Sequence, residues 1–351
     1  MANISYILKN FNTVIKLSDV DRNKLIIARD SLRSRMKEGF AAISEKNGHE
    51  LDFQSQGSFI TDLIIKPVND DFDLDDGVYF QGNMAKDKRQ EPKVFHDWVK
   101  ASIGTYDRVE KIIEKPTCIR VKYKDGFHID IPIYYADNYQ NPDLAHLKVG
   151  WMLSNPVEFI AWFEEKAKSG FNKAFLYENS LYTEPYEKWL NDVRKQDCQL
   201  RRLVRYLKAW ADLKRKEMPC GIIMTILVAN NFAIDDRDDI ALRNTLVNIK
   251  NYLAGNGYKC PRPTEPVGED LFESTTESDK QYFKAALQSL IDSLNVAIGS
   301  KTEKRACEEL GKHFGSRFPS NLANDNIVAP REDLSSLKRI ASQSQPWSSN
   351  S

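Results

Sequence analysis

The chain has 351 residues, 41% of them hydrophobic and 28% charged, as in a globular protein large enough for two domains. Its 50 Lys and Arg balance its 50 Asp and Glu, so overall charge gives no means of attracting nucleic acid or an anionic membrane. No apolar run is long enough to span a bilayer, and the five cysteines have no CxxC spacing. We therefore expect a cytoplasmic protein with reduced thiols and no structural zinc site.

The N-terminal half mixes helical and extended patterns. The expected elements are a long helix over 18–45, an extended segment over 51–54, a turn at 57–58, a strand over 73–80, a helix over 91–103, and two strands over 118–124 and 128–134.

The last two strands are expected to pair in a defined register. Their apolar side chains alternate, and both apolar faces are buried together if Val121 lies opposite Ile131. This pairing needs a three-residue loop with Gly126 in the left-handed region. Arg120 then shares the polar face with Asp130.

From about residue 155 the composition becomes helical. The clearest helix covers 198–213, and Arg201, Arg205 and Lys208 form a cationic stripe on it at spacings of four and three residues. Such a stripe is either a solvated helix face or, beside a cleft for polyphosphate, a phosphate-binding surface. Further helices are expected over 222–230, 240–253, 278–299 and 302–314, followed by a flexible tail rich in Ser, Asn, Pro and Gln.

Three aspartates are the strongest candidates for chemistry. Asp73 and Asp75 are two apart on one strand and point the same way, so they repel each other unless a cation intervenes. Asp130 lies between isoleucines on another strand, where a carboxylate is costly unless it is paired or bound to metal. Oxygen ligands at this density suit Mg²⁺ or Mn²⁺, so the pattern predicts two metal ions held against a nucleoside triphosphate. Asp130 is also the expected proton acceptor from a ribose hydroxyl. A bare D-x-D pair, by contrast, is most often a solvated loop.

Two further features fit a triphosphate site. The backbone N–H groups and the hydroxyl of Gly57 and Ser58 can face terminal phosphates, because glycine lets the backbone approach closely. Arg120 either contacts phosphate or base, or forms a salt bridge to an acid of the cluster.

Three segments carry a family resemblance. They are Gln56-Gly57-Ser58, Asp73-Leu74-Asp75-Asp76-Gly77-Val78-Tyr79-Phe80 and His128-Ile129-Asp130-Ile131-Pro132-Ile133-Tyr134. In this order they resemble the cGAS/DncV-like nucleotidyltransferases (CD-NTases) of bacterial antiphage systems, and in particular the DncV-like branch that makes cyclic GMP-AMP. Residues 203–214, with Pro219-Cys220-Gly221 after them, look like a helix and turn of that branch. The likeness extends over most of residues 50–275.

The resemblance implies an α+β fold. A polymerase-β-like nucleotidyltransferase core, a mixed sheet flanked by helices, is joined to a C-terminal helical domain, with the active site in the cleft between them. We expect the core with its N-terminal helix at residues 1–150, the helical domain at 151–320 and the flexible tail at 321–351.

The resemblance also implies residue roles. The acids Asp73, Asp75 and Asp130 bind metal, and the expected nucleotide contacts are Gln56, Gly57, Ser58, Arg120, Lys208, Cys220 and Asp270. Lys208 matches a lysine that contacts the donor triphosphate. Cys220 and Gly221 stand where the branch has a serine, so that backbone N–H groups replace its hydroxyl.

The implied function is synthesis of cyclic GMP-AMP from ATP and GTP through a linear intermediate, using two Mg²⁺ ions. The product would be a second messenger for an effector in antiphage (CBASS) defence, and the C-terminus would be joined to a conjugation or regulatory partner. Two alternatives stay open: another cyclic di- or trinucleotide, or a nucleotide-binding regulatory protein without turnover. Balanced charge argues against an obligatory nucleic-acid partner.

Overall fold

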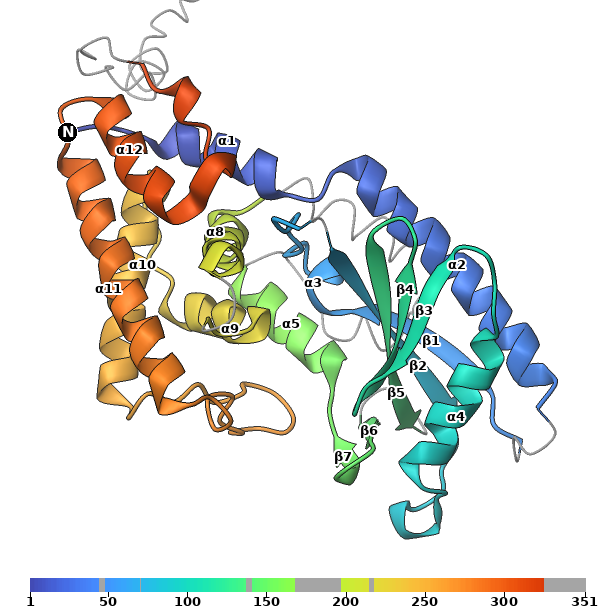
Figure 1. The fold of residues 1–351 in the computed structure, drawn as a ribbon. Coiled ribbons are helices and arrows are strands. Elements are labelled where there is room, and N and C mark those ends of the chain that lie inside the picture. The colour runs from blue at the N-terminus through green and yellow to red at the C-terminus, as the bar shows by residue number, and fades with distance from the viewer. Residues whose placement is uncertain (44–47, 70, 137–140, 168–196, 215–217, 325–351) are drawn as a thin grey trace, which may run out of the picture.

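The computed structural model describes residues 1–43, 48–69, 71–136, 141–167, 197–214 and 218–324 (Figure 1). Most of the predicted tail, residues 325–351, lies outside the described residues. The described chain consists of a sheet half and a helical half, which lie side by side in Figure 1. The expected α+β class is therefore confirmed.

The sheet half contains the strands and the helices that cover them. Its strands are β1 (Leu51–Gln56), β2 (Phe72–Gln81), β3 (Val109–Glu114), β4 (Cys118–Tyr123), β5 (Phe127–Ala136), β6 (Asp143–His146) and β7 (Gly150–Leu153). Its helices are α2 (Asp19–Ala41), α3 (Gly57–Ile60), η1 (Lys86–Lys88) and α4 (Pro92–Ile103).

The sheet is mixed, and its central pair is parallel. The strand order is β1-β2-β5-β4-β3, with β6 paired to β5 and β7 to β6. Only β2 and β5 run parallel among the described pairs; the others are antiparallel. Helices α2 and α4 pack together over the apolar face of the sheet (Figure 1). Helix α2 begins after Ser18, whose hydroxyl accepts the backbone N–H of Asp21 at 3.1 Å.

The predicted register of β4 and β5 is wrong by two residues. The connecting loop has three residues and Gly126 has a φ of 87°, as predicted, but the loop covers 124–126 instead of 125–127. Val121, however, lies opposite Ile129 and Lys122 opposite His128, a register in which the buried rings of Tyr123 and Phe127 stack with centroids 4.6 Å apart. A shift of two residues keeps every side chain on its predicted face.

The helical half contains the N-terminal helix and the C-terminal helices. Its elements are α1 (Ser5–Ile15), α5 (Pro156–Lys166), α8 (Gln199–Lys214), α9 (Gly221–Asn231), α10 (Asp238–Gly255), α11 (Glu277–Gly299), α12 (Glu303–Phe314), η2 (Gly315–Arg317) and η3 (Ser320–Leu322). The helices predicted from residue 198 to 314 are confirmed, whereas α1 was not predicted.

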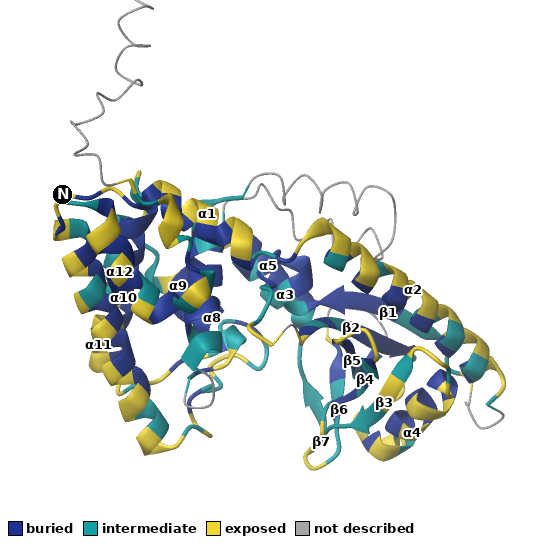
Figure 2. Cartoon of the chain, turned by 45° about the horizontal axis from the view of Figure 1, so that its top comes forward, coloured by how far each residue is buried: buried dark blue, intermediate teal, exposed yellow. Residues whose placement is uncertain are grey.

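Two hydrophobic clusters underlie the two halves. One joins the sheet to α2 and α4, and the other joins α1 to α8–α12. Figure 2 shows β1 largely buried, as are β2 and β5, and the outer face of α2 exposed, whereas β3 and β7 are exposed or half-buried. Helix α1 thus packs with C-terminal helices, although it precedes the sheet in the chain. The domain limits expected at residues 150 and 320 stay predictions. No helix in the described part of the chain is long and apolar enough to cross a membrane.

Candidate active site

The parallel pair of strands brings the predicted acids together. In the ladder between β2 and β5, Asp75 lies opposite Asp130 and Asp73 opposite His128. On the other side of β2, Gln56 of β1 lies opposite Asp75. Asp75 therefore lies between Gln56 on one neighbouring strand and Asp130 on the other. Side chains alternate along a strand, so Asp73 lies on the same face as Asp75.

The Gly57-Ser58 turn lies directly against Asp75. Strand β1 runs straight into the single turn of α3, and Gly57 has a φ of 66°, which favours glycine. A Cβ atom at this position would also collide with the Oδ2 atom of Asp75. Both the backbone conformation and the lack of space thus require glycine at position 57. This close approach puts Ser58 beside the carboxylates.

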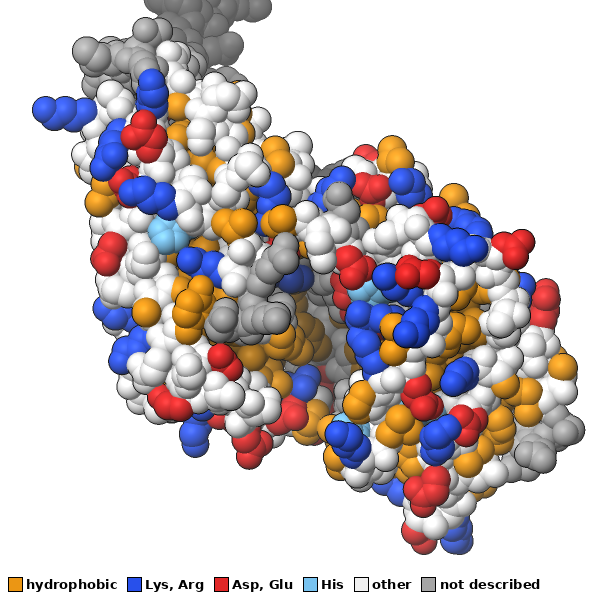
Figure 3. Space-filling model, viewed as in Figure 1, with side chains coloured by type: hydrophobic (Ala, Val, Ile, Leu, Met, Phe, Trp, Pro, Cys, Tyr) orange, Lys and Arg blue, Asp and Glu red, His pale blue; other side chains and the backbone are white. Residues whose placement is uncertain are grey.

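A cavity of about 480 Å³ lies between the two halves at this point. Figure 3 shows the surface hollowed between the halves. Six of the predicted site residues line the cavity: Gln56, Gly57, Ser58, Asp73, Asp75 and Lys208. The other wall includes Phe159, Ile222, Thr225, Arg262, Thr264 and Glu265, none of which was predicted. One side of the cavity is therefore rich in acids, and the far wall carries mixed polar and apolar groups.

Asp75 is in an environment that disfavours its charge. Burial, followed by the charges of Asp73 and Asp130, raises the pKa of Asp75 well above its usual value, and Lys208 and Arg120 only partly oppose this. A group of carboxylates in this state attracts a cation, and hard oxygen donors suit Mg²⁺ or Mn²⁺. The chemistry of the donor set fits the predicted metal.

Asp130 is bound by arginine. The Arg120 Nε and Nη2 atoms donate to its two carboxylate oxygens at 2.6 and 2.7 Å, and Lys115 lies 3.5 Å from Oδ2. Burial alone would raise the pKa of Asp130, but the Arg120 hydrogen bonds and charge lower it below its usual value. Of the two roles considered for Arg120, the salt bridge is the one formed.

The salt bridge to Arg120 bears on the two roles expected of Asp130, as proton acceptor and as metal ligand. A carboxylate with a lowered pKa is a weak base, which argues against Asp130 as the proton acceptor. Each Asp130 oxygen already accepts one hydrogen bond from Arg120, which leaves a second lone pair on each for a metal ion. No three acidic, His or Cys side chains among the described residues are already arranged as a metal-binding group. The three acids stay predicted ligands.

Lys208 brings a positive charge to the cavity, close to Asp73 and Asp75. Its Nζ atom donates to the Leu63 carbonyl at 2.9 Å, and burial lowers its pKa to about 8 against the opposing influence of Asp73 and Asp75. The backbone of Gly221 packs on its stem, since a Cβ there would lie 3.0 Å from Cε. Cys220 caps α9 and is exposed, and it does not line the cavity in the described structure.

Asp270 has internal partners. Its Oδ1 atom accepts the backbone N–H groups of Cys260 and Phe272 at 2.9 and 3.0 Å, which closes the loop that carries Arg262 and Glu265. A direct nucleotide contact by Asp270 stays a prediction. The prolines at 261, 263 and 266 mark this stretch as a loop in the sequence, but they do not indicate that it lines the cavity.

Comparison with known proteins gives a domain match and distant relatives. Residues 51–134 match the family described as cyclic GMP-AMP synthase DncV-like, nucleotidyltransferase domain. A cyclic GMP-AMP synthase of Escherichia albertii is 25% identical over 238 residues, which cover 65% of this chain and 45% of that protein. A c-di-GMP synthase of Roseivirga ehrenbergii is 23% identical over 71% of this chain and 70% of that protein. The chain thus spans about half the length of the first relative.

The solved structures share the whole fold. The Vibrio cholerae DncV cyclic AMP-GMP synthase superposes with a TM-score of 0.72 at 18% identity, covering 93% of this chain and 100% of that chain. The Bradyrhizobium diazoefficiens CD-NTase CdnG, solved in complex with GTP, gives a TM-score of 0.68 at 18% identity over 90% and 96% of the two chains. The domain match, the relatives and the fold agree: residues 51–134 match a DncV-like nucleotidyltransferase domain, and the chain is similar to the cGAS/DncV-like nucleotidyltransferases (CD-NTases).

Proposed function

We propose that the protein is a divalent-metal-dependent nucleotidyltransferase that joins two nucleoside triphosphates into a cyclic dinucleotide. One observation carries this proposal: Asp73 and Asp75 line a cavity together with the Gly57-Ser58 turn and Lys208. Carboxylates for metal, backbone donors for phosphate and a half-buried ammonium group are the parts that phosphoryl transfer requires. The two synthases named above support the choice of a cyclic dinucleotide.

The cavity suggests how a donor nucleotide lies. Its triphosphate would lie along Gly57, Ser58 and Lys208. Its base would extend toward the far wall, where Arg262 offers donors and Glu265 offers acceptors, beside the apolar side chains of Phe159 and Ile222. Purine edges present both kinds of hydrogen-bonding group, so this wall is suited to distinguish bases.

In each transfer a ribose hydroxyl oxygen bonds to the donor α-phosphorus, the bond to the bridging oxygen breaks, and pyrophosphate leaves. Metal ions held by Asp73, Asp75 and Asp130 would activate the hydroxyl and neutralise the leaving group. Lys208 donates to the phosphate oxygens, and the hydroxyl proton passes to a carboxylate or to water. A second transfer in the same cavity closes the ring.

The proposed substrates are ATP and GTP and the product is cyclic GMP-AMP, as the name of the Escherichia albertii relative suggests. The c-di-GMP synthase among the relatives makes a ring with two guanines the second candidate. We further propose that the product is a second messenger for an effector in antiphage (CBASS) defence in the cytoplasm. The C-terminus would serve a conjugation or regulatory partner.

The decisive experiment incubates the purified protein with single and paired nucleoside triphosphates and Mg²⁺ or Mn²⁺, followed by mass spectrometry. A cyclic product should form with the wild type and be lost in Asp73→Asn and Asp75→Asn. Asp71→Asn is the matched control, because Asp71 is exposed and bonds to His128 at 2.8 Å.

The product identifies the bases and thereby separates the two candidates. A linear dinucleotide alone would support a nucleotidyltransferase that does not cyclise. If the protein binds triphosphate but releases no pyrophosphate under any metal condition, it is a nucleotide-binding regulatory protein without turnover.

A further inference from the structure

The cationic stripe of α8 is directed at the loop that follows the Gly57-Ser58 turn. Each of its three members donates a hydrogen bond to one backbone carbonyl of three consecutive residues. The pairs are Arg201 Nε to Thr61 O at 3.2 Å, Arg205 Nε to Asp62 O at 2.8 Å and Lys208 Nζ to Leu63 O at 2.9 Å. One face of a helix therefore holds one short stretch of chain, which we call the clamped loop (residues 61–63).

Arg201 and Arg205 are fully buried, so neither predicted role for them applies. The Arg205 Nη1 atom donates to Asn12 and Asp197 at 2.8 Å, and Nη2 donates to the Asp62 carboxylate at 2.8 Å. Arg201 also pairs with the buried Glu164. Their donors are used inside the protein, which leaves Lys208 as the member of the stripe that lines the cavity.

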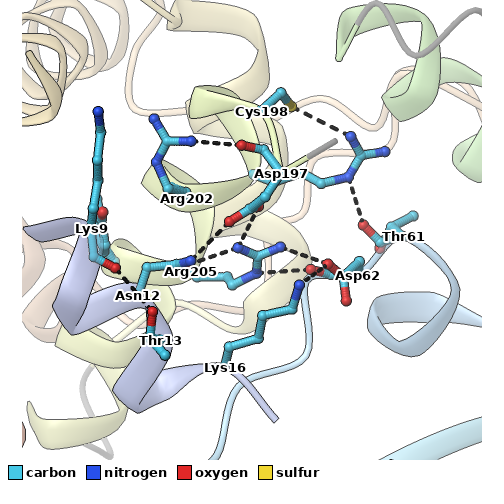
Figure 4. Close-up of polar contacts among 12 residues, drawn as sticks. Lys9, Asn12, Thr13, Lys16, Thr61, Asp62, Asp197, Cys198, Arg202 and Arg205 are labelled. Atoms are coloured by element: carbon cyan, nitrogen blue, oxygen red, sulfur yellow. Dashed lines mark hydrogen bonds and ion pairs between the residues drawn. The ribbon is translucent and has the colours of Figure 1, made fainter. Parts of the chain in front are cut away.

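The Asp62 carboxylate ties the clamped loop to other parts of the chain. It is 1% exposed and contacts Lys16 and Arg205 at 2.8 Å and Arg22 at 2.6 Å. Figure 4 shows Lys16 and Arg205 both directed at it. Asp62 also has a φ of 56°, a conformation that aspartate tolerates better than most residues. One side chain thus links the α1–α2 connection, α2 and α8.

The clamped loop lies where the chain passes from one core to the other. Phe59 and Ile60 belong to the sheet cluster, Leu63 belongs to the helical cluster, and Ile64 belongs to the sheet cluster again. The Gly57-Ser58 turn stands at the start of this passage, and the Leu63 carbonyl at its end holds Lys208. The spacing between turn and lysine therefore depends on residues 61–63.

We propose that Asp62 and Arg205 are positioning residues for the donor triphosphate. They touch no substrate themselves; they hold the clamped loop on α8, so that the Gly57-Ser58 turn and Lys208 keep the separation that a triphosphate needs. The proposal rests on the proposed function for the identity of the ligand. A misplacement of such groups by about 1 Å is enough to weaken binding and catalysis.

The test compares two arginines of the same helix. Arg205→Lys keeps the charge but loses the fork that spans the Asp62 carbonyl and carboxylate. Arg202→Lys is the control, because Arg202 makes an equally close fork, at 2.7 Å, to Asp238 of α10. For each variant we would measure the affinity for a non-hydrolysable GTP or ATP analogue with Mg²⁺, the midpoint of thermal unfolding, and amide exchange of a peptide covering residues 57–65.

Arg205→Lys should weaken analogue binding about tenfold, equivalent to about 1.4 kcal/mol, and speed exchange in residues 57–65. Arg202→Lys should leave both within about twofold at a similar loss of thermal stability. Equal losses of affinity in the two variants, or unchanged affinity in Arg205→Lys, would overturn the positioning role.

A milder variant protects the test against misfolding. Lys16→Met removes one partner of Asp62 from a side chain that is 27% exposed, and it should weaken binding about threefold. If the wild type binds no nucleotide at all, the proposed function fails. The exchange measurement needs no ligand, so unchanged exchange in Arg205→Lys would still reject the clamp by itself.

Discussion

Two acidic sites lie close together in the chain, and their surroundings are opposite. Asp62 contacts three cations, and although burial alone would raise its pKa, Arg205, Arg22 and Lys16 hold it below the usual value. The pKa of Asp75 is raised by burial and by Asp73 and Asp130. The first site has its counter-charges built in and joins parts of the fold. At the second, Lys208 and Arg120 only partly offset the clustered negative charge, which suits a site that recruits metal and triphosphate.

The strongest test of this difference between Asp62 and Asp75 is to remove the charge of Asp75. Asp75→Asn should lower turnover by about 10³-fold or more, since a catalytic metal contributes several kcal/mol. Because the charge is disfavoured in the folded state, the same change should leave the free energy of unfolding unchanged or raised. Steady-state assays and urea unfolding measure the two effects. A marked loss of stability would show that Asp75, like Asp62, is structural.

Asp62→Asn should give the converse result for stability. Loss of this carboxylate leaves three buried or half-buried cations without their partner, which costs about 3 kcal/mol of unfolding free energy. Urea unfolding would measure it, with Asp71→Asn as the exposed control. A change within error would mean that the cations find other partners and that Asp62 does not link these elements.

Ligand stabilisation separates the sites further. Mg²⁺ with a non-hydrolysable triphosphate at about 100 times its Kd should stabilise the wild type by about 2.7 kcal/mol. Asp75→Asn should lose most of this gain, whereas Arg202→Lys should keep it. Thermal unfolding with and without the ligands gives the values, and an undiminished gain in Asp75→Asn would remove Asp75 from the metal site.

The smallest expected effect is on pH dependence, where the two aspartates should have opposite signs. Asp62 has a lowered pKa in the folded state, so its contribution is present above its ordinary value of 3.8 and is lost as pH falls through the folded pKa. Asp75 has a raised pKa, so folding takes up a proton and stability falls as pH rises above 3.8. The measurement is the difference in unfolding free energy between wild type and each asparagine variant as a function of pH. The advantage of the wild type over Asp62→Asn should shrink as pH falls below 3.8. Relative to Asp75→Asn, the wild type should lose stability as pH rises above 3.8.

Local patterns predicted much of the candidate site. The period of two along a strand put Asp73 beside Asp75 and Arg120 on the face of Asp130, and these assignments depend only on alternation. Alternation alone did not predict the register of β4 and β5. The register depends on burying the Tyr123 and Phe127 rings together.

The cationic stripe marks the limit of such reasoning. The spacing of Arg201, Arg205 and Lys208 identified one helix face, but the carbonyls they contact lie 140 to 145 residues earlier in the chain. No local pattern in the sequence indicates which distant backbone will meet a helix face. The far wall of the cavity, with Arg262 and Glu265, was missed for the same reason.

The alternation of Leu63 and Ile64 between two cores has a consequence for engineering. Most loops accept an inserted residue, because their ends can shift while the elements stay in place. Here an insertion would have to pull one side chain out of a packed interior or rotate one half against the other. New termini, split points and inserted tags should therefore avoid residues 61–64, because this segment contributes side chains to the hydrophobic cores of both halves.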